Sequence, residues 1–156
     1  MQKNVQMHKK YSDNVLLDAI LQDAANTCED HNIKFSATLH MSGGMVLSDL
    51  NIVLVSNNIL NNAIEACEKV PYTSDRFIEI NGSVNPDWSF IEISNSFSGE
   101  IKYHGGELVT SKKDKDYHGY GLMTVKKIIE DVGGMVLIDV NQEKRIFTVK
   151  LHIPRN

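Results

Sequence analysis

The sequence predicts a two-layer α/β (α+β) sandwich, with about three helices on one face of a mixed, mostly antiparallel sheet. The order of its periodic segments supports this fold: helix, strand, helix, hairpin, long loop, helix, hairpin. Strands and helices do not alternate along the chain, which excludes a doubly wound dinucleotide-binding fold. At 156 residues, 42% of them apolar, the chain has the size and composition of one globular domain.

Two helices and a strand are expected in the first half. The first helix begins after Ser12 or Asn14, either of which can cap it, because apolar residues recur from there at helical spacing. Residues 33–39 alternate apolar and polar side chains, the period of a half-buried strand. A second apolar stripe predicts a helix from near Ser48 to about Lys69.

Later segments with alternating polarity are expected to form two hairpins: residues 77–84 with 88–94, and residues 135–140 with 145–153. Asn85-Pro86-Asp87, a strong turn former, joins the first pair. Residues 97–119 are polar and contain glycines, and loops of this length inside compact domains are functional or mobile. A third helix is expected over residues 122–131, ended by Gly133-Gly134.

Composition excludes several classes of function. The net charge is −4 and the chain has no basic cluster, which argues against nucleic-acid binding. Cys28 and Cys67 lack the spacing of a zinc site or a redox pair and suit a reducing cytoplasm. No apolar run is long enough to span a bilayer, and residues 1–10 are too polar for a signal peptide.

An asparagine cluster in the second predicted helix is the first candidate site. Asn58 and Asn62 are four residues apart and therefore share one helix face. A carboxamide oxygen is a hard, neutral ligand that suits Mg²⁺, whose other ligands are usually waters and nucleotide phosphates. The alternative is a solvated, asparagine-rich helix face.

A glycine motif before the third predicted helix is the second candidate. In His118-Gly119-Tyr120-Gly121-Leu122, the glycines would let the backbone approach a ligand closely. The N-terminus of the following helix would offer free N–H groups to a phosphate. The alternative is a glycine-rich turn with no ligand.

Taken in order, these motifs resemble the GHKL ATPase superfamily. The series is Asn-Asn-Ala-Ile-Glu-Ala at 61–66, a strand ending Ser94-Asn95-Ser96, then Thr110-Ser111-Lys112, then the glycine motif. The resemblance extends over about residues 14–153 and is closest to the peptide-sensing, quorum-sensing type of histidine kinase.

The resemblance implies a Bergerat (histidine kinase ATPase-like) fold in which ATP and Mg²⁺ lie across the asparagine helix. It implies that Asn62 is a Mg²⁺ ligand, with Asn58 as a second candidate. Asn95 would accept a hydrogen bond from the adenine amino group, and residues 99–117 would form the ATP lid. The other nucleotide contacts that it implies are Lys112, His118, Gly119, Tyr120, Gly121 and Leu122.

The sequence departs from the superfamily pattern at three positions. Asn95 replaces the usual adenine-reading aspartate, and a neutral acceptor forms a weaker hydrogen bond than a charged one. Asn58 stands where gyrase and MutL carry a glutamate general base, which argues against hydrolysis and fits phosphotransfer, where positioning dominates. Glu65 stands where many histidine kinases have a basic phosphate contact, so this contact is either lost or supplied by Lys112.

The expected organisation is a linker remnant over residues 1–11 and one ATP-binding catalytic domain over residues 12–156. This domain would present Mg-ATP to a histidine on a separate dimerisation hairpin, upstream of a response regulator. It would be a cytoplasmic monomer without direct membrane contact, would hold no catalytic residue itself and would not autophosphorylate alone. The alternative is a GHKL-fold nucleotide-binding module that regulates a protein partner, as a pseudokinase or anti-sigma-type kinase.

Overall fold

The computed structural model describes residues 9–41, 45–104, 107–109 and 115–155, and the side chains of these residues outside 102–120. The helices and strands are, in chain order, α1 (Val15–Asp30), β1 (Lys34–Thr38), α2 (Asp49–Glu68), the 3₁₀ turn η2 (Thr73–Asp75), β2 (Phe77–Val84), β3 (Trp88–Ser96), β4 (Lys102–His104), β5 (Glu107–Val109), α3 (Lys115–Asp131), β6 (Met135–Asn141) and β7 (Ile146–Pro154).

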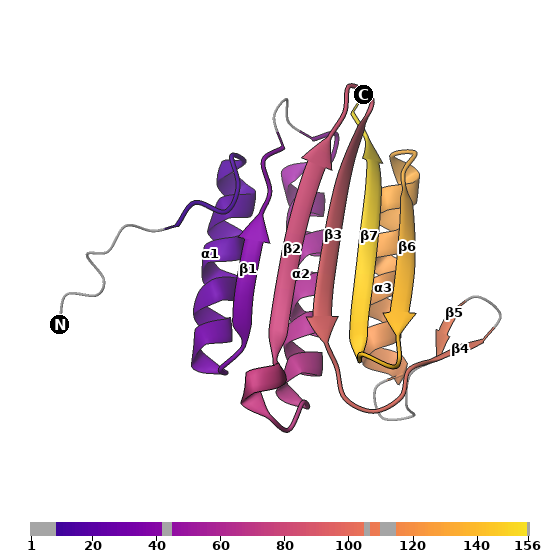
Figure 1. The fold of residues 1–156 in the computed structure, drawn as a ribbon. Helices are drawn as coiled ribbons and strands as arrows, with labels where there is room; N and C mark the ends of the chain where they lie inside the picture. The colour runs from indigo at the N-terminus through magenta and orange to yellow at the C-terminus, as the bar shows by residue number, and fades with distance from the viewer. Residues whose placement is uncertain (1–8, 42–44, 105–106, 110–114, 156) are drawn as a thin grey trace.

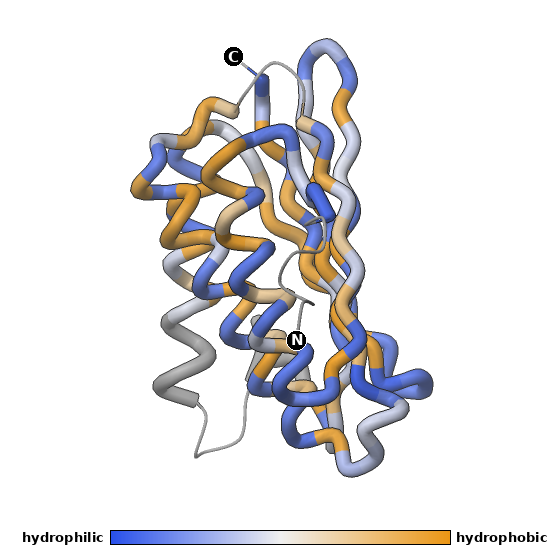
Figure 2. The backbone as a smooth tube through the Cα atoms, turned by 90° about the vertical axis from the view of Figure 1, so that its left-hand side faces the viewer, coloured by the Kyte–Doolittle hydropathy of each residue, from blue (hydrophilic) through white to orange (hydrophobic). Residues whose placement is uncertain are grey.

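The main sheet has the strand order β1-β2-β3-β7-β6. β1 runs parallel to β2, and every other neighbouring pair in this sheet is antiparallel. The helices α1, α2 and α3 lie behind the sheet in Figure 1, and Figure 2 shows the two layers edge-on. The predicted two-layer sandwich with a mixed, mostly antiparallel sheet is confirmed.

Side-chain caps fix where the first two long helices begin. The side chain of Asn14 accepts a hydrogen bond from the backbone N–H of Leu17 at 2.9 Å, and the hydroxyl of Ser48 accepts one from Asn51 at 3.2 Å. Each cap satisfies a backbone donor that has no partner within its helix. Of the two expected caps for α1, Asn14 is used, whereas Ser12 forms an isolated bridge with the residue after β1.

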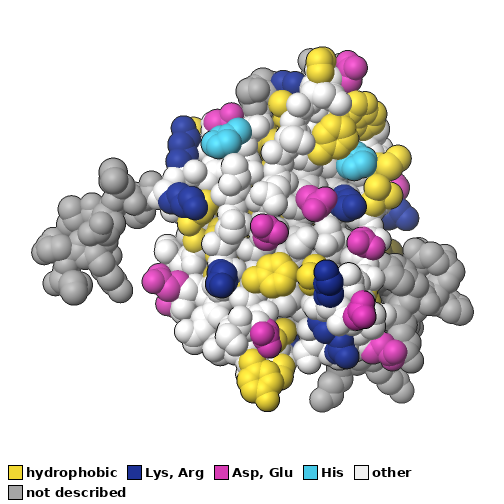
Figure 3. All heavy atoms as spheres, in the orientation of Figure 1, with side chains coloured by type: hydrophobic (Ala, Val, Ile, Leu, Met, Phe, Trp, Pro, Cys, Tyr) yellow, Lys and Arg dark blue, Asp and Glu magenta, His cyan; other side chains and the backbone are white. Residues whose placement is uncertain are grey.

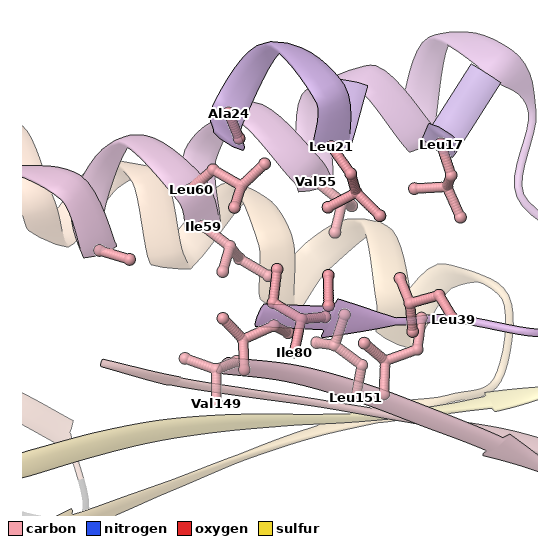
Figure 4. Packing of buried hydrophobic residues seen from close by; sticks show 14 of the residues in the cluster. Leu17, Leu21, Ala24, Leu39, Val55, Ile59, Leu60, Ile80, Val149 and Leu151 are labelled. Carbon is pink, nitrogen blue, oxygen red and sulfur yellow. The ribbon is translucent and has the colours of Figure 1, made fainter. Parts of the chain in front are cut away.

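The hydrophobic core lies between the two layers, as Figure 4 shows from close by. Leu21 of α1 and Ile59 of α2 point toward the sheet, where Ile80 and Leu151 meet them. Burial of each such side chain stabilises the fold by about 1.5–3 kcal/mol. The core therefore holds α2 firmly against the sheet and fixes which face of α2 points away from it.

Charged residues occupy the opposite face of the sheet, which Figure 3 shows. On β2 and β3, exposed Glu79 and Glu92 alternate with buried Ile80 and Ile93. Lys150 of β7 pairs directly with Glu92 across the ladder. This alternation is typical of a sheet that is covered on one face only.

The third helix begins earlier than the sequence pattern predicted. It starts at Lys115 rather than near residue 122, so residues 118–121 lie inside α3. The prediction was wrong because the two glycines were treated as a turn, although a glycine costs only about 1 kcal/mol in a helix interior. Within this longer helix, Gly121 lies beside Asn58 of α2.

The region between β3 and α3 also differs from the expected irregular loop. It contains the antiparallel strands β4 and β5, in which Tyr103 pairs with Leu108. Because most residues around these two strands are polar, the sequence pattern did not predict them, although they contain the good strand formers tyrosine, leucine and valine. Within the described ranges, none of the helices is long and apolar enough to cross a membrane.

Candidate functional site

Two asparagines of α2 and one glycine of α3 meet in the middle of the helix layer. The side chains of Asn58 and Asn62 are half-buried. A Cβ atom at position 121 would lie 3.2 Å from Oδ1 of Asn58 and 3.5 Å from Nδ2 of Asn62. Because even a methyl group would press on the Asn58 oxygen, Gly121 lets α3 approach these two amides closely.

The orientation of the Asn58 amide follows from a hydrogen bond within its own helix. Nδ2 of Asn58 donates to the carbonyl oxygen of Leu54 at 2.8 Å. The amide nitrogen is therefore engaged, and the amide oxygen is the atom that faces Gly121. Asn58 thus presents a neutral acceptor to this space and cannot act as a general base at neutral pH.

Asn95 lies near the end of β3, on the side of the sheet that the helices cover. It alternates along β3 with the same spacing as buried Ile91 and Ile93, so its side chain shares their face of the sheet and is only 4% exposed. Its Nδ2 donates to the carbonyl oxygen of Ser96 at 2.9 Å, which leaves Oδ1 as the remaining polar atom of the side chain. In this orientation, Asn95 can accept a hydrogen bond from an amino group of a ligand.

Cys67 connects α2 to the residue that follows Asn95. The Sγ atom of Cys67 lies 3.5 Å from Oγ of Ser96, and Oγ of Ser96 accepts from the backbone N–H of Phe77 at 3.0 Å. Burial raises the pKa of the Cys67 thiol, and a hydrogen bond from the Ser96 hydroxyl lowers it in part. Burial, and secondarily Cys67, raise the pKa of Cys28 to about 12. Both thiols therefore stay neutral and act as structural groups.

The structure locates the glycine motif differently from the sequence prediction. His118, Gly119 and Tyr120 belong to α3, and their side chains lie outside the described part, as does all of Lys112. Leu122 is half-buried and packs against the core. The N-terminus of α3 is at Lys115, about 10 Å along the helix axis from residue 122. The free N–H groups of this helix therefore lie farther from the asparagines than the motif suggested.

The turn between β6 and β7 holds the start of the segment that follows β3. The side chain of Gln142 donates to the carbonyl oxygen of Gly99 at 2.7 Å and accepts from the N–H of Ile101 at 3.1 Å. Arg145 also donates to the carbonyl oxygen of Gly99. Sequence reasoning missed Gln142 and Arg145, because a turn residue that anchors a distant segment has no periodic pattern to reveal it.

Two further asparagines of α2 and Glu65 border a second surface of the molecule. Asn57, Asn61 and Glu65 line a groove between α1 and α2. Glu65 also stands three residues after Asn62 and seven after Asn58, so it lies at the boundary between this groove and the helix face that carries those two amides. The asparagine cluster thus serves two different surfaces of one helix.

The described side chains offer two kinds of ligand contact, oxygen donors for a hard cation on α2 and an acceptor for an amino group on β3. The amides of Asn58 and Asn62 are oxygen donors of the kind that Mg²⁺ accepts, and Asn95 adds a buried acceptor. Gly121 leaves room at the amides that any side chain would fill. Among the described residues, no group of three or more His, Cys, Asp or Glu side chains is placed to hold a metal ion by itself. A cation here would need ligands from a bound molecule as well.

Comparisons with known proteins show the family and the fold of the chain. Residues 47–154 match the family model described as the GHKL domain. The catalytic domain of histidine kinase ThkA superposes with a TM-score of 0.67, at 20% identity, over 96% of this chain and 97% of that one. Histidine kinase AdeS of Acinetobacter baumannii gives 0.59 at 14% identity, over 99% and 72% of the two chains. The cytoplasmic segment of histidine kinase QseC gives 0.57 at 15% identity, over 89% and 72%. No curated protein matches the sequence.

Proposed function

Because the chain belongs to the GHKL domain family, we propose that it binds Mg-ATP on the α3-facing side of α2 as the catalytic domain of a two-component histidine kinase. It would present the γ-phosphate to a histidine on a separate dimerisation hairpin. The observation that carries this proposal is the close approach of α3 at Gly121 to the amides of Asn58 and Asn62. Residues from two motifs far apart in the sequence form one site there.

The amides of Asn58 and Asn62 fit a magnesium ion. Both are neutral oxygen-bearing groups, and Mg²⁺ is usually held by few protein ligands together with waters and phosphates. Asn62 is the proposed ligand, and Asn58 the second candidate. When bound, the ion would neutralise charge on the β- and γ-phosphates. Asn58 orients its oxygen toward this space through its own hydrogen bond to Leu54.

Asn95 is the proposed adenine contact. Adenine carries an amino group where guanine carries a carbonyl oxygen, and Oδ1 of Asn95 can pair only with the amino group. The hydrogen bond from Nδ2 to Ser96 uses one N–H of this amide and fixes which way its oxygen faces. An uncharged acceptor makes a weaker bond than a carboxylate, so we expect affinity in the micromolar to sub-millimolar range.

Phosphotransfer to a protein histidine is favoured over hydrolysis by the same residues. Water needs a general base to become a good nucleophile, and Asn58 cannot act as one. A histidine brings its own nucleophilic nitrogen, so the domain has only to position ATP and neutralise charge. The start of α3, the lid segment over residues 99–117 and Lys112 would supply the remaining phosphate contacts.

The wider context is also a proposal. The segment Asn95-Ser96-Phe97-Ser98-Gly99, which has an asparagine in place of the usual adenine-reading aspartate, supports a parent kinase of the peptide-sensing, quorum-sensing type. In that context the domain would lie on the cytoplasmic side of a membrane-bound sensor. Its hairpin partner would pass the phosphoryl group to a response regulator.

Labelling with γ-labelled ATP tests the proposal. We expect no label on the isolated chain and acid-labile, base-stable label on a dimerisation hairpin of the same kinase supplied in trans. Asn62→Ala should abolish the transfer, whereas Asn26→Ala, the same change on the exposed face of α1, should not affect it. Nucleotide binding without transfer to the hairpin would contradict the kinase assignment and indicate a regulatory nucleotide-binding module.

A further inference from the structure

An open groove of about 580 Å³ runs between α1 and α2. Ile20 and Ala24 of α1 and Leu60 and Ile64 of α2 form an apolar floor. Leu60 and Ala24 are buried, whereas Ile20 and Ile64 remain half-exposed. The groove is thus a partly exposed extension of the core between two helices that α3 does not cover.

Asn57 and Asn61 stand at the rim of this groove. Asn57 directly precedes Asn58, and Asn61 directly precedes Asn62. Neighbouring residues in an α-helix point about 100° apart around its axis, so this pair faces a different direction from the pair at the nucleotide site. Nucleotide binding therefore gives no reason for this second pair. Side-chain amides can both donate and accept hydrogen bonds, so the pair can bond to polar groups of a molecule seated in the groove.

The helices that flank the groove carry only negative charge. α1 and α2 hold seven acidic residues and no lysine or arginine: Asp18, Asp23, Glu29, Asp30, Asp49, Glu65 and Glu68. Two of them, Asp23 and Glu65, line the groove itself. The chain has 16 lysines and arginines in total, so this absence is local rather than a matter of composition.

Arg76 lies at the C-terminal ends of α1 and α2. Arg76 follows η2 and donates to the carbonyl oxygens of Val70, His31 and Glu68, at 3.0, 2.8 and 3.2 Å. Its guanidinium therefore ties the C-terminal ends of α1 and α2 together. These three bonds join the ends of the two helices beyond the residues that line the groove.

We propose that the groove between α1 and α2 docks an amphipathic, basic helix of a protein partner. The apolar stripe of such a helix would cover Ile20 and Ile64, and its flanking lysines or arginines would meet Asp23 and Glu65. Helix-in-groove recognition joins an apolar stripe to an apolar floor in this way. The acidic flanks repel nucleic acids and anionic lipid surfaces, which leaves a cationic protein segment as the fitting occupant.

A designed peptide tests the groove directly. The probe is a fluorescein-labelled peptide of about 18 residues, long enough to form a helix on binding, with leucines at helical spacing and lysines elsewhere. Its isomer with glutamate in place of lysine has the same apolar stripe. Fluorescence anisotropy should show saturable binding of the Leu-Lys peptide and at least about tenfold weaker binding of the Leu-Glu peptide. Equal binding of the two peptides would refute the proposal that the partner is basic.

Matched charge reversals separate the groove from the net charge of the chain. Asp23→Lys with Glu65→Lys should weaken Leu-Lys binding at least about tenfold. The control, Glu130→Lys with Asp139→Lys, makes the same charge change at exposed residues of α3 and β6 and should alter binding less than about twofold. Equal weakening by both doubles would refute the proposal.

Backbone amide shifts locate the peptide. The largest changes in a ¹⁵N spectrum should fall within residues 19–27 and 57–65, and largest changes elsewhere would count against the groove. Asn62→Ala should leave peptide binding unchanged. A failure of the groove can therefore be told from a failure of the nucleotide site.

Discussion

Replacement of Gly121 by alanine should change stability and nucleotide binding in opposite directions. Alanine is favoured over glycine in a helix interior by about 1 kcal/mol. The new Cβ would lie 3.2 Å from Oδ1 of Asn58, so this amide would have to shift by a few tenths of an ångström. The crowding offsets part of the gain, and we expect the free energy of unfolding to rise by about 0–1 kcal/mol.

The same shift should weaken Mg-ATP binding. The methyl group occupies the space in which the oxygen of Asn58 and the amide of Asn62 face α3. Loss or distortion of one hydrogen bond to a charged group costs about 1.5–3 kcal/mol, which corresponds to roughly 10- to 150-fold in the dissociation constant. The variant would thus be a well-folded domain that binds nucleotide poorly.

Two measurements on one preparation test this reasoning. Thermal unfolding should show a melting temperature within about 4 °C of the parent, and no lower. Calorimetric titration with Mg-ATP should show the loss of affinity. Glu130→Ala, an exposed change on α3, is the control and should leave binding intact. If the folded Gly121→Ala variant bound Mg-ATP with the affinity of the parent, the proposal that α2 and α3 together form the nucleotide site would be refuted.

Other substitutions make further tests. Asn62→Ala should remove the Mg²⁺-dependent part of ATP binding in calorimetry; an unchanged Mg²⁺ dependence would show that the ligand is elsewhere. Asn95→Asp should destabilise the domain at neutral pH, because an oxygen would replace the Nδ2 that now donates to Ser96; the deficit should shrink as acid protonates the new carboxyl, and urea melts that show no pH dependence would contradict this. Gly134→Ala should lower the free energy of unfolding by about 2 kcal/mol or more, since its Cβ would lie 2.3 Å from the carbonyl oxygen of His152; a parental urea midpoint would contradict that contact.

The sequence was most informative where a cap and an apolar stripe agreed. α2 begins after Ser48 and ends within one residue of the expected boundary, because both signals are local. Local signals failed at α3, where the helix runs through two glycines and the second of them packs against α2. Helix propensity alone could not reveal that stabilisation, since it depends on a neighbour far away in the sequence.

The candidate site was only partly predictable. The spacing of Asn58 and Asn62 placed them on one helix face, and their motif resemblance linked them to the glycines. Neither the spacing nor the resemblance could predict that Gly121 would lie beside both amides from inside a helix. The groove between α1 and α2 was not predictable either, because it depends on how far two helices diverge over the sheet, which tertiary packing decides.

The single parallel pairing of the main sheet, β1 with β2, has a consequence for how the protein folds. The antiparallel neighbours β2 and β3, and likewise β6 and β7, are joined by short turns and can form early as local contacts. β1 can pair only after the chain has closed a long crossover that contains α2. We therefore expect α1 and β1 to dock late and to open first in native-state hydrogen exchange, as a cooperative unit separate from the antiparallel strands.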